Sequence, residues 1–475
     1  MKKQNLLRLI EALLFCVLLL GVLGGVSEIM ERKMSNIRFK PFYQKAQQHD
    51  VVFIGDSHMV NGVFPMELWK EYGITSYNLS SYGNTLPVSY WTLMNALDYA
   101  SPKLAVIGVK DVEKDRKLTS SSSDVHTALD AYPLTLTKIR AIEDLMDDPD
   151  IMDDAGNRYT DMKWEYYFTL GKYHDRWSEL SWNDIEYELN CQKGGDMLVA
   201  VAEPDDYELI DYDRVADEIG AGYLYLRRII EKCKNRGMDV LLTHLPYPSD
   251  ADDQMAANTV ALIAEEYGIG FIDFVSLDQV VDYHTDCYDA DSHLNASGAQ
   301  KVTDYLGHYI RSHYEIPDRR GDEMYAAWND DYDEFLRYKE ERLREQKNLH
   351  DVLMLLHDSS YRIDLAIDAQ AEVYWDDQAL TLMHNAARER VHEDSEDMWS
   401  DCMFSLEGLE EALAADEAYF LQLECAGGNA EEFVGSDARA QAERIFGEAV
   451  WEDGKEIRLR VMDRAGDRII ASYQF

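Results

Sequence analysis

Between about residues 50 and 315, short runs of consecutive apolar residues alternate with segments in which apolar side chains recur every three or four positions. Short continuous apolar runs are typical of strands buried on both faces, and the longer spacing is typical of helices packed on a core. The pattern predicts five strands, at 51–54, 76–80, 103–109, 238–246 and 271–275. It predicts helices at 87–99, 215–235, 251–267 and 296–314. Buried strands separated by helices indicate an α/β fold with a doubly wound parallel sheet, in which ligands bind at the carboxyl ends of the strands.

About 100 residues between the third strand and the helix at 215–235 do not follow this alternation. They include a serine-rich run, an acidic run and the aromatic-rich stretch MKWEYYFTLGKYHDRWSELSW. A connection of this length usually has structure or function of its own. We expect residues 110–210 to form a cap over the strand ends, inserted into a domain that covers residues 35–320.

The composition changes beyond Pro317. Residues 331–360 have the pattern of one charged amphipathic helix, and we assign 321–360 to a linker helix. Residues 361–475 contain the stretches YRIDLAID, AEVYWDD and AYFLQLECA and close with a hairpin-like pair. They predict a small α+β accessory domain, in which no group of titratable residues suggests chemistry.

The N-terminus carries Lys2, Lys3 and Arg8 before an apolar run that ends at Val26. Counted from Leu6 the run has the reach of a bilayer-spanning helix, roughly 30 Å. A cleaved signal peptide has the same layout, but no A-x-A-like cleavage site follows. We therefore expect residues 1–34 to be a single-pass membrane anchor, with the remaining chain outside the cytoplasm.

Charge and cysteine content argue against nucleic-acid binding and against a zinc site. The chain has 90 acidic and 46 basic residues, a formal net charge of −44. Such a surface repels phosphate backbones, so we expect no nucleic-acid partner. The six cysteines are scattered without a CxxC pair, which argues against a zinc site, and we expect neither a metal nor a cofactor.

Two loops carry the candidate chemistry. In VVFIGDSHMVNG, Ser57 directly follows the first strand, where it is either a nucleophile or a helix cap. A serine nucleophile needs a base within hydrogen-bond reach and an acid behind that base. The loop YDADSHLNASG lies before the last helix, on the same sheet edge, and offers His293 as the base. Either Asp289 or Asp291 would orient it.

These motifs resemble the SGNH (GDSL-type) hydrolase superfamily. GDS follows an apolar strand, a Gly-Asn pair follows the second strand, and Asp-x-His-Leu-Asn precedes the terminal helix, in the family's order over about residues 50–315. The chain is most similar to the membrane-anchored branch related to D-alanyl-lipoteichoic-acid biosynthesis proteins and polysaccharide O-acetyltransferases. The resemblance implies a flavodoxin-like sheet, a serine nucleophile and a His-Asp pair from one loop. It also implies an oxyanion hole made by the serine amide, a glycine amide and an asparagine side chain.

Carried over by position, Gly83 and Asn84 match the oxyanion block. Two departures from the family pattern concern the acid and the third block. The family's Asp three residues before the histidine is Ala290 here, which leaves Asp289 or Asp291. The family's G-x-N-D block has Lys110 in place of its Asn, so either Asn84 substitutes or the oxyanion hole is incomplete.

Several other polar residues could have either a structural or a functional role. His58 is expected to line the pocket without chemistry of its own, and Asn295 to cap the last helix. His174, Arg176 and Trp177 in the insertion suit the binding of a sugar or a carboxylate, and a structural salt bridge explains them equally well. Asp289 and Asp291 could instead bind calcium, although the glycine and distal glutamate of an EF-hand loop are missing.

The sequence thus predicts an anchored extracytoplasmic esterase or O-acyltransferase, with Ser57 attacking an ester carbonyl to form an acyl-enzyme. The family resemblance favours cell-envelope or exported glycans as acceptors, and a multi-spanning membrane acyltransferase as partner. A rival hypothesis is a non-catalytic surface module that uses the sheet as a scaffold, which the Lys110 departure favours.

Overall fold

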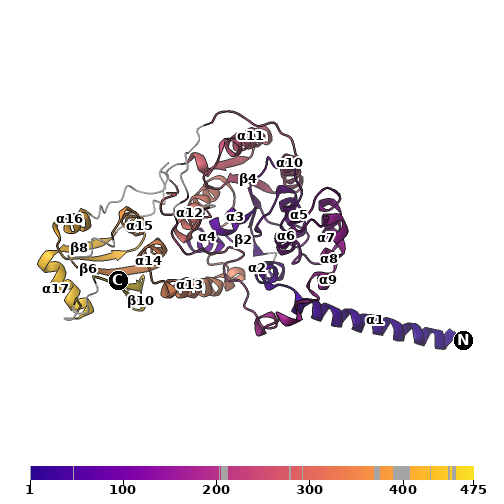
Figure 1. Cartoon of the computed structure of the whole chain (residues 1–475), viewed down its shortest axis with the longest axis horizontal. Coiled ribbons are helices and arrows are strands. Elements are labelled where there is room, and N and C mark those ends of the chain that lie inside the picture. The colour runs from indigo at the N-terminus through magenta and orange to yellow at the C-terminus, as the bar shows by residue number, and fades with distance from the viewer. Residues whose placement is uncertain are drawn as a thin grey trace.

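The computed structural model describes residues 2–45, 48–202, 204, 212–277, 280–290, 293–368, 375–388, 407–427, 429–447, 450–451 and 456–475. Figure 1 shows a long N-terminal helix that projects from an α/β domain, and a smaller domain at the other end of the molecule. The projecting helix is α1 (Lys2–Met30), followed by α2 (Lys33–Gln44). The segment Asn5–Met30 of α1 is long enough and on average apolar enough to cross a bilayer, and none of its apolar window is buried against the protein.

The first domain is built on a five-stranded parallel sheet in the order β2-β1-β3-β4-β5. The strand β1 lies between β2 and β3 and pairs with β2 through Val51 and Ser76, and with β3 through Val51 and Leu104. The strands are β1 (Val51–Ile54), β2 (Ser76–Asn78), β3 (Leu104–Gly108), β4 (Asp239–His244) and β5 (Gly270–Asp273). All five lie where the apolar pattern predicts them, and the doubly wound α/β prediction is confirmed.

Helices cover both faces of this sheet because successive strand residues point to opposite sides. Val51 and Phe53 of β1 join one buried apolar cluster, whereas Val52 and Ile54 join another. The first cluster includes side chains of α4 and α12, and the second includes side chains of α5, α10 and α11. These helices are α3 (Ser57–Gly62), α4 (Pro65–Tyr72), α5 (Leu86–Ala96), α10 (Ala221–Lys234), α11 (Ala251–Tyr267) and α12 (Ala296–His313).

The α10 helix begins later than the predicted 215–235. Gly220, which directly precedes it, has a φ of 112°, a left-handed backbone conformation that interrupts a helix. The apolar side chain of Ile219, which the pattern placed on the helix, is instead 69% exposed. The predicted helix therefore begins too early, at residue 215 instead of Ala221.

The insertion forms a group of short helices beside α5. Its own buried cluster combines Val88 of α5 with apolar side chains from residues 118–166. The elements are α6 (Ser122–Leu129), α7 (Leu136–Leu145), α8 (Tyr159–Tyr167), α9 (Leu170–Tyr173), η2 (Arg176–Ser178) and η3 (Trp182–Asp184). Its last stretch then passes the strand ends, where Asp196 N donates to Val60 O at 3.1 Å and Ala202 N donates to Cys287 O at 2.9 Å.

The predicted single helix over 331–360 is wrong. The chain forms η5 (Glu323–Tyr325), α13 (Ala327–Glu345) and a separate α14 (Leu349–Leu355). The break occurs because Gln346 has an extended backbone, and Asn348 then caps α14 by accepting a hydrogen bond from His350 N at 2.8 Å. Asparagine is among the preferred residues at a helix N-cap, and here it starts a second helix inside a pattern that otherwise continues.

The second domain is an antiparallel five-stranded sheet in the order β10-β9-β6-β7-β8. Its strands are β6 (Tyr361–Ile367), β7 (Tyr419–Glu424), β8 (Ala430–Val434), β9 (Ile457–Asp463) and β10 (Ile469–Gln474). Its helices are α15 (Asp377–Ala387), α16 (Glu407–Ala415) and α17 (Gly435–Phe446). The predicted small α+β domain is confirmed, although much of AEVYWDD lies outside the described residues.

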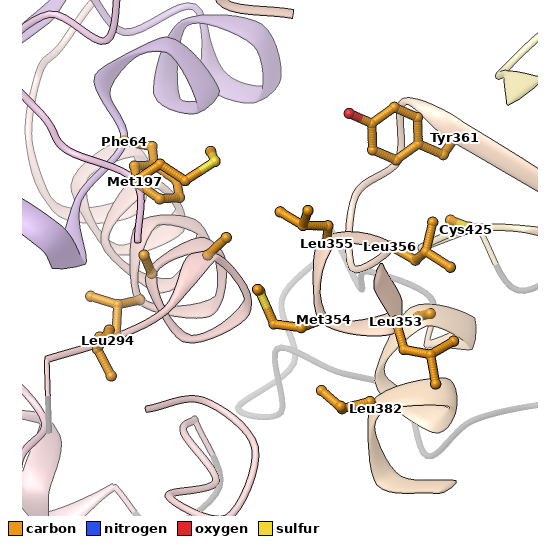
Figure 2. Close-up of a cluster of buried hydrophobic side chains, with 14 of the residues drawn as sticks. Phe64, Met197, Leu294, Leu353, Met354, Leu355, Leu356, Tyr361, Leu382 and Cys425 are labelled. Atoms are coloured by element: carbon orange, nitrogen blue, oxygen red, sulfur yellow. The ribbon is translucent and has the colours of Figure 1, made fainter. Parts of the chain in front are cut away.

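The two domains share one buried apolar cluster. Figure 2 shows Phe64, Met197 and Leu294 of the first domain facing the α14 region and the second sheet. The residues labelled on that opposite side are Leu353, Met354, Leu355, Leu356, Tyr361, Leu382 and Cys425. Because this cluster is continuous, the second domain is packed against the first and is not held by a free linker.

Candidate active site

The strand β1 delivers Ser57 to the carboxyl edge of the sheet. Gly55 and Asp56 follow the strand, and Ser57 is the first residue of α3, so Asp56 occupies the N-cap position. Val60 N donates to Asp56 O at 3.1 Å, which closes the first turn of α3. Ser57 is therefore not the cap of this helix, and its hydroxyl is directed to a partner from a distant loop.

That partner comes from the loop before α12, which is closed like a short hairpin. Cys287 and Leu294 form an antiparallel bridge, and Tyr288 N donates to His293 O at 2.7 Å. Asn295 ends the loop and caps α12, accepting from Ser297 N at 3.1 Å, as the sequence predicted. A bridge at one end and a cap at the other fix the position of His293.

The structure brings Ser57, His293 and Asp289 into one chain of hydrogen bonds. Ser57 Oγ lies 2.9 Å from His293 Nε2, and His293 Nδ1 lies 2.8 Å from Asp289 Oδ2. Asp289 also accepts from the backbone N of His293 at 3.0 Å. A carboxylate facing Nδ1 keeps the proton on that nitrogen, which leaves Nε2 to accept the serine proton. Asp291, the other candidate acid, lies outside the described residues.

His58 packs on the face of His293. The two imidazole centroids are 4.6 Å apart with planes inclined by 28°, and His58 Nδ1 lies 3.3 Å from Asp56 Oδ2. Burial lowers the pKa of His58 below its usual range, and the Asp56 carboxylate offsets only part of that effect. Burial raises the pKa of Asp56, but the neighbouring His58 and Lys110 outweigh it, so this pKa is lower than usual. At neutral pH, His58 is therefore uncharged, and its ring stacks on that of His293.

A second polar group lies beside His58, and of its members the sequence identified only Lys110. Lys110 Nζ lies 3.2 Å from His58 Nδ1 and 4.5 Å from the centroid of the Tyr247 ring. Tyr247 Oη lies 3.1 Å from His244 Nε2, and His244 Nδ1 lies 3.0 Å from Asp273 Oδ1. All these residues lie at or just beyond the carboxyl ends of β3, β4 and β5. Their place after predicted strands was the available signal, because parallel strands bring such residues to one edge.

The predicted oxyanion residues lie beside the first loop. Asn84 is buried, and its side-chain Nδ2 donates to Gly55 O at 3.1 Å, two residues before Ser57. Gly83 has a φ of 63°, and a Cβ at this position would come 2.8 Å from Asp124 Oδ2, so only glycine fits without displacing that side chain. The Gly-Asn pair is therefore held close to the backbone that carries Ser57.

The second domain supports the histidine loop. Gln378 Nε2 of α15 donates to His284 O at 2.7 Å, and Ser297 Oγ lies 3.3 Å from His357 Nδ1. From α12, the buried Lys301 Nζ donates to Asp286 Oδ2 of the loop at 2.7 Å. The backbone on both sides of His293 is thus braced by α12 and by the second domain.

The proposed substrate-binding residues of the insertion are placed elsewhere. His174 Nδ1 donates to Gly171 O at 2.7 Å, and Arg176 Nη2 donates to Asp184 Oδ1 at 3.1 Å. Arg176 also donates to the carbonyl of Met30, the last residue of α1. Trp177 is 64% exposed. The described contacts of Arg176 join the insertion to the end of α1 and not to Ser57 or His293.

Among the described residues, no group of three His, Cys, Asp or Glu side chains is arranged to hold a metal ion. Both carboxylate oxygens of Asp289 face His293 Nδ1, at 3.1 and 2.8 Å. The two Asp289 oxygens that the calcium hypothesis would use as ligands therefore face the imidazole.

Comparison with known proteins gives distant likenesses to solved structures alone. No protein-family model matches the chain, and no curated protein matches it. Among solved structures, the chain is similar to a "putative acylhydrolase" from Bacteroides fragilis NCTC 9343, at 14% sequence identity and a TM-score of 0.29. The match covers 59% of this chain and 99% of the other.

Proposed function

We propose that the protein is a serine esterase or O-acyltransferase of the SGNH type. The observation that supports this function is the chain of hydrogen bonds from Ser57 Oγ through His293 to Asp289, at 2.9 and 2.8 Å. The nucleophile and the base come from loops that are more than 200 positions apart, so no local sequence effect explains their contact. A base in reach of a serine and an acid behind the base is the arrangement that activates a hydroxyl for acyl transfer.

In the proposed reaction, Ser57 Oγ attacks the carbonyl carbon of an ester while its proton passes to His293 Nε2. The Asp289 carboxylate stabilises the imidazolium through the Nδ1 hydrogen bond. The imidazolium then protonates the leaving alcohol, which yields an acyl-Ser57 ester. Water or a glycan hydroxyl, deprotonated by His293, attacks this ester in the second half and releases Ser57.

A cell-envelope or exported glycan is the proposed acceptor, and acetyl the proposed acyl group. Two features support this: the resemblance to envelope-modifying SGNH proteins, and α1, which is long and apolar enough to hold the enzyme at a membrane. A multi-spanning acyltransferase in the same membrane would be the donor. An exported enzyme without access to cytoplasmic acyl carriers needs such a donor for transfer, whereas hydrolysis needs none.

Asn84 is the proposed side-chain donor of the oxyanion hole. We expect Asn84→Ala to lower kcat about 10²- to 10³-fold with little change in KM, because such a donor acts mainly in the transition state. Lys110→Ala is the matched control, since Lys110 Nζ contacts His58 and the Tyr247 ring. We expect it to lower kcat less than about tenfold. Hydrolysis of a p-nitrophenyl ester by the full chain measures both, and a reversed order would make Lys110 the donor.

The test of the proposed function is labelling by a fluorophosphonate probe, which reacts with activated serines. We expect the full chain in detergent micelles to be labelled and Ser57→Ala to abolish labelling. Ser276→Ala is the control, because Ser276 Oγ donates to a carboxylate, Asp273 Oδ2 at 2.7 Å, and has no imidazole partner among the described contacts. A folded wild-type protein that is not labelled would instead support the non-catalytic module.

A further inference from the structure

The aromatic-rich part of the insertion is fixed to the end of α1. Ser27 Oγ lies 2.9 Å from Thr169 Oγ1, and the Thr169 hydroxyl also bonds Glu31. Arg176 donates to the carbonyl of Met30. Figure 1 shows α9 beside the root of α1, where the long helix leaves the folded domains. This part of the insertion therefore lies at the level at which α1 emerges.

Residues 168–189, which we call the aromatic face, expose large apolar side chains to an unusual degree. Trp177 is 64% exposed and Trp182 is 68% exposed. The other large apolar side chains that it exposes are Phe168, Ile185 and Leu189. The backbone beneath them is held in place, since Arg176 bonds Asp184 at 3.1 Å and Ser181 and Asp184 form a capping box. An exposed apolar patch on an ordered backbone marks a contact surface.

The depth of the aromatic face along α1 matches the lipid headgroup layer. Val26 ends the apolar run, and Met30 lies four residues further on, about 6 Å along the helix axis. The headgroup layer on each side of a bilayer is about 5–8 Å thick. Tryptophan concentrates at this level, because its ring is apolar and its N–H is polar. With α1 across the membrane, Trp177 and Trp182 would therefore lie among the headgroups.

The charges around the aromatic face have both signs. Arg32 lies 3.6 Å from Glu179, and Lys40 lies 2.7 Å from Glu28. Paired charges of this kind gain little from an anionic membrane surface, so the indole rings and not the cations would provide the attraction.

We propose that the aromatic face rests in the headgroup layer of the membrane that α1 crosses, with Trp177 and Trp182 as interfacial anchors. This docking fixes the orientation of the α/β domain above the bilayer, which α1 alone would leave free to rotate. The proposal assigns Trp177 to lipid rather than to a sugar. It depends on α1 spanning the bilayer and is independent of the chemistry at Ser57.

The test is fluorescence quenching by brominated lipids. The full chain is reconstituted in phosphatidylcholine vesicles with bromine near the headgroup or deep in the acyl chains. The difference in tryptophan emission between the wild type and the double variant Trp177→Phe/Trp182→Phe is the signal of these two indoles. We expect headgroup-proximal bromine to quench this signal at least about twofold, and more than deep bromine does. Adding anionic phosphatidylglycerol should leave the quenching unchanged.

The control moves an indole to another exposed site. Leu262→Trp in the Trp177→Phe/Trp182→Phe background places the ring on α11, at a position that is 52% exposed and at the far side of the domain from α1 in Figure 1. We expect no quenching of that indole. Equal quenching at both sites, no quenching of Trp177 and Trp182, or release of the protein from vesicles by alkaline carbonate would each overturn the proposal. Hydrolysis of a soluble ester should be the same in all these variants.

Discussion

Replacement of Ser57 by alanine is expected to lower kcat for ester hydrolysis about 10⁴- to 10⁶-fold. His293→Ala is expected to cost about as much, because nucleophile and base act as one unit through the 2.9 Å contact between Ser57 Oγ and His293 Nε2. For the same reason the double variant should be hardly slower than either single variant. The measurement is kcat for a p-nitrophenyl ester with the full chain in detergent. Multiplying losses would contradict a shared catalytic unit.

Replacement of Asp289, the acid of the proposed triad, is expected to lower kcat less than replacement of Ser57 or His293. Asp289 is 35% exposed on its side chain, so water replaces part of its stabilisation of His293. We therefore expect Asp289→Asn to cost only about 10²- to 10³-fold in kcat, less than a fully buried triad acid does. Asp291→Asn is the matched control and should change kcat less than about threefold, because Asp289 already bonds His293 Nδ1. A larger loss at Asp291 than at Asp289 would reverse the assignment of the acid.

The fold could be predicted where one physical rule was sufficient. Strands buried on both faces are often near-continuous apolar runs, so Val51–Ile54 and Leu104–Gly108 were recognisable without any structure. The break in the predicted 331–360 helix and the start of α10 were not recognisable in this way. Each depends on the backbone conformation at one position. Asn348 as a cap and Gly220 at positive φ interrupt patterns that otherwise continue.

The pairing of Ser57 with His293 could be predicted because topology brings loops after parallel strands to one edge. The contact of Asp289 with His293 Nδ1 could not, since it depends on how the loop closes through the bridge of Cys287 and Leu294. The location of Arg176 was also beyond the sequence. A cation in an inserted segment has many possible partners, and its contact with the end of α1 is a tertiary one.

The second domain gains a role from the structure that its sequence did not suggest. It supports the histidine loop through Gln378, and His357, just before β6, contacts Ser297 of α12. It also joins the first domain through a buried charged group, in which Lys339 of α13 contacts both Glu67 of α4 and Asp358. Lys70 lies 3.5 Å from Asp358 at the edge of this group. Because charges and apolar core are shared across the junction, we expect the two domains to unfold together.

Lys339→Met is expected to destabilise the protein by about 3–5 kcal/mol, because it leaves the Glu67 and Asp358 carboxylates buried without their common cation. Burial raises the pKa of Asp358, but Lys339 and Lys70 outweigh it and hold this pKa below its usual range. The stability from this charge pair is therefore present above about pH 4 and is lost as the pH falls further.

Thermal unfolding of Lys339→Met at neutral pH should show a single transition, with a Tm about 5–10 °C below that of the wild type. Lys70→Met, whose side chain is 22% exposed, is the matched control and should lower it less. Adding Glu67→Gln and Asp358→Asn to Lys339→Met should recover part of the lost stability, because the unpaired carboxylates are removed. Two separate unfolding transitions in the wild-type protein would contradict a junction shared by the two domains.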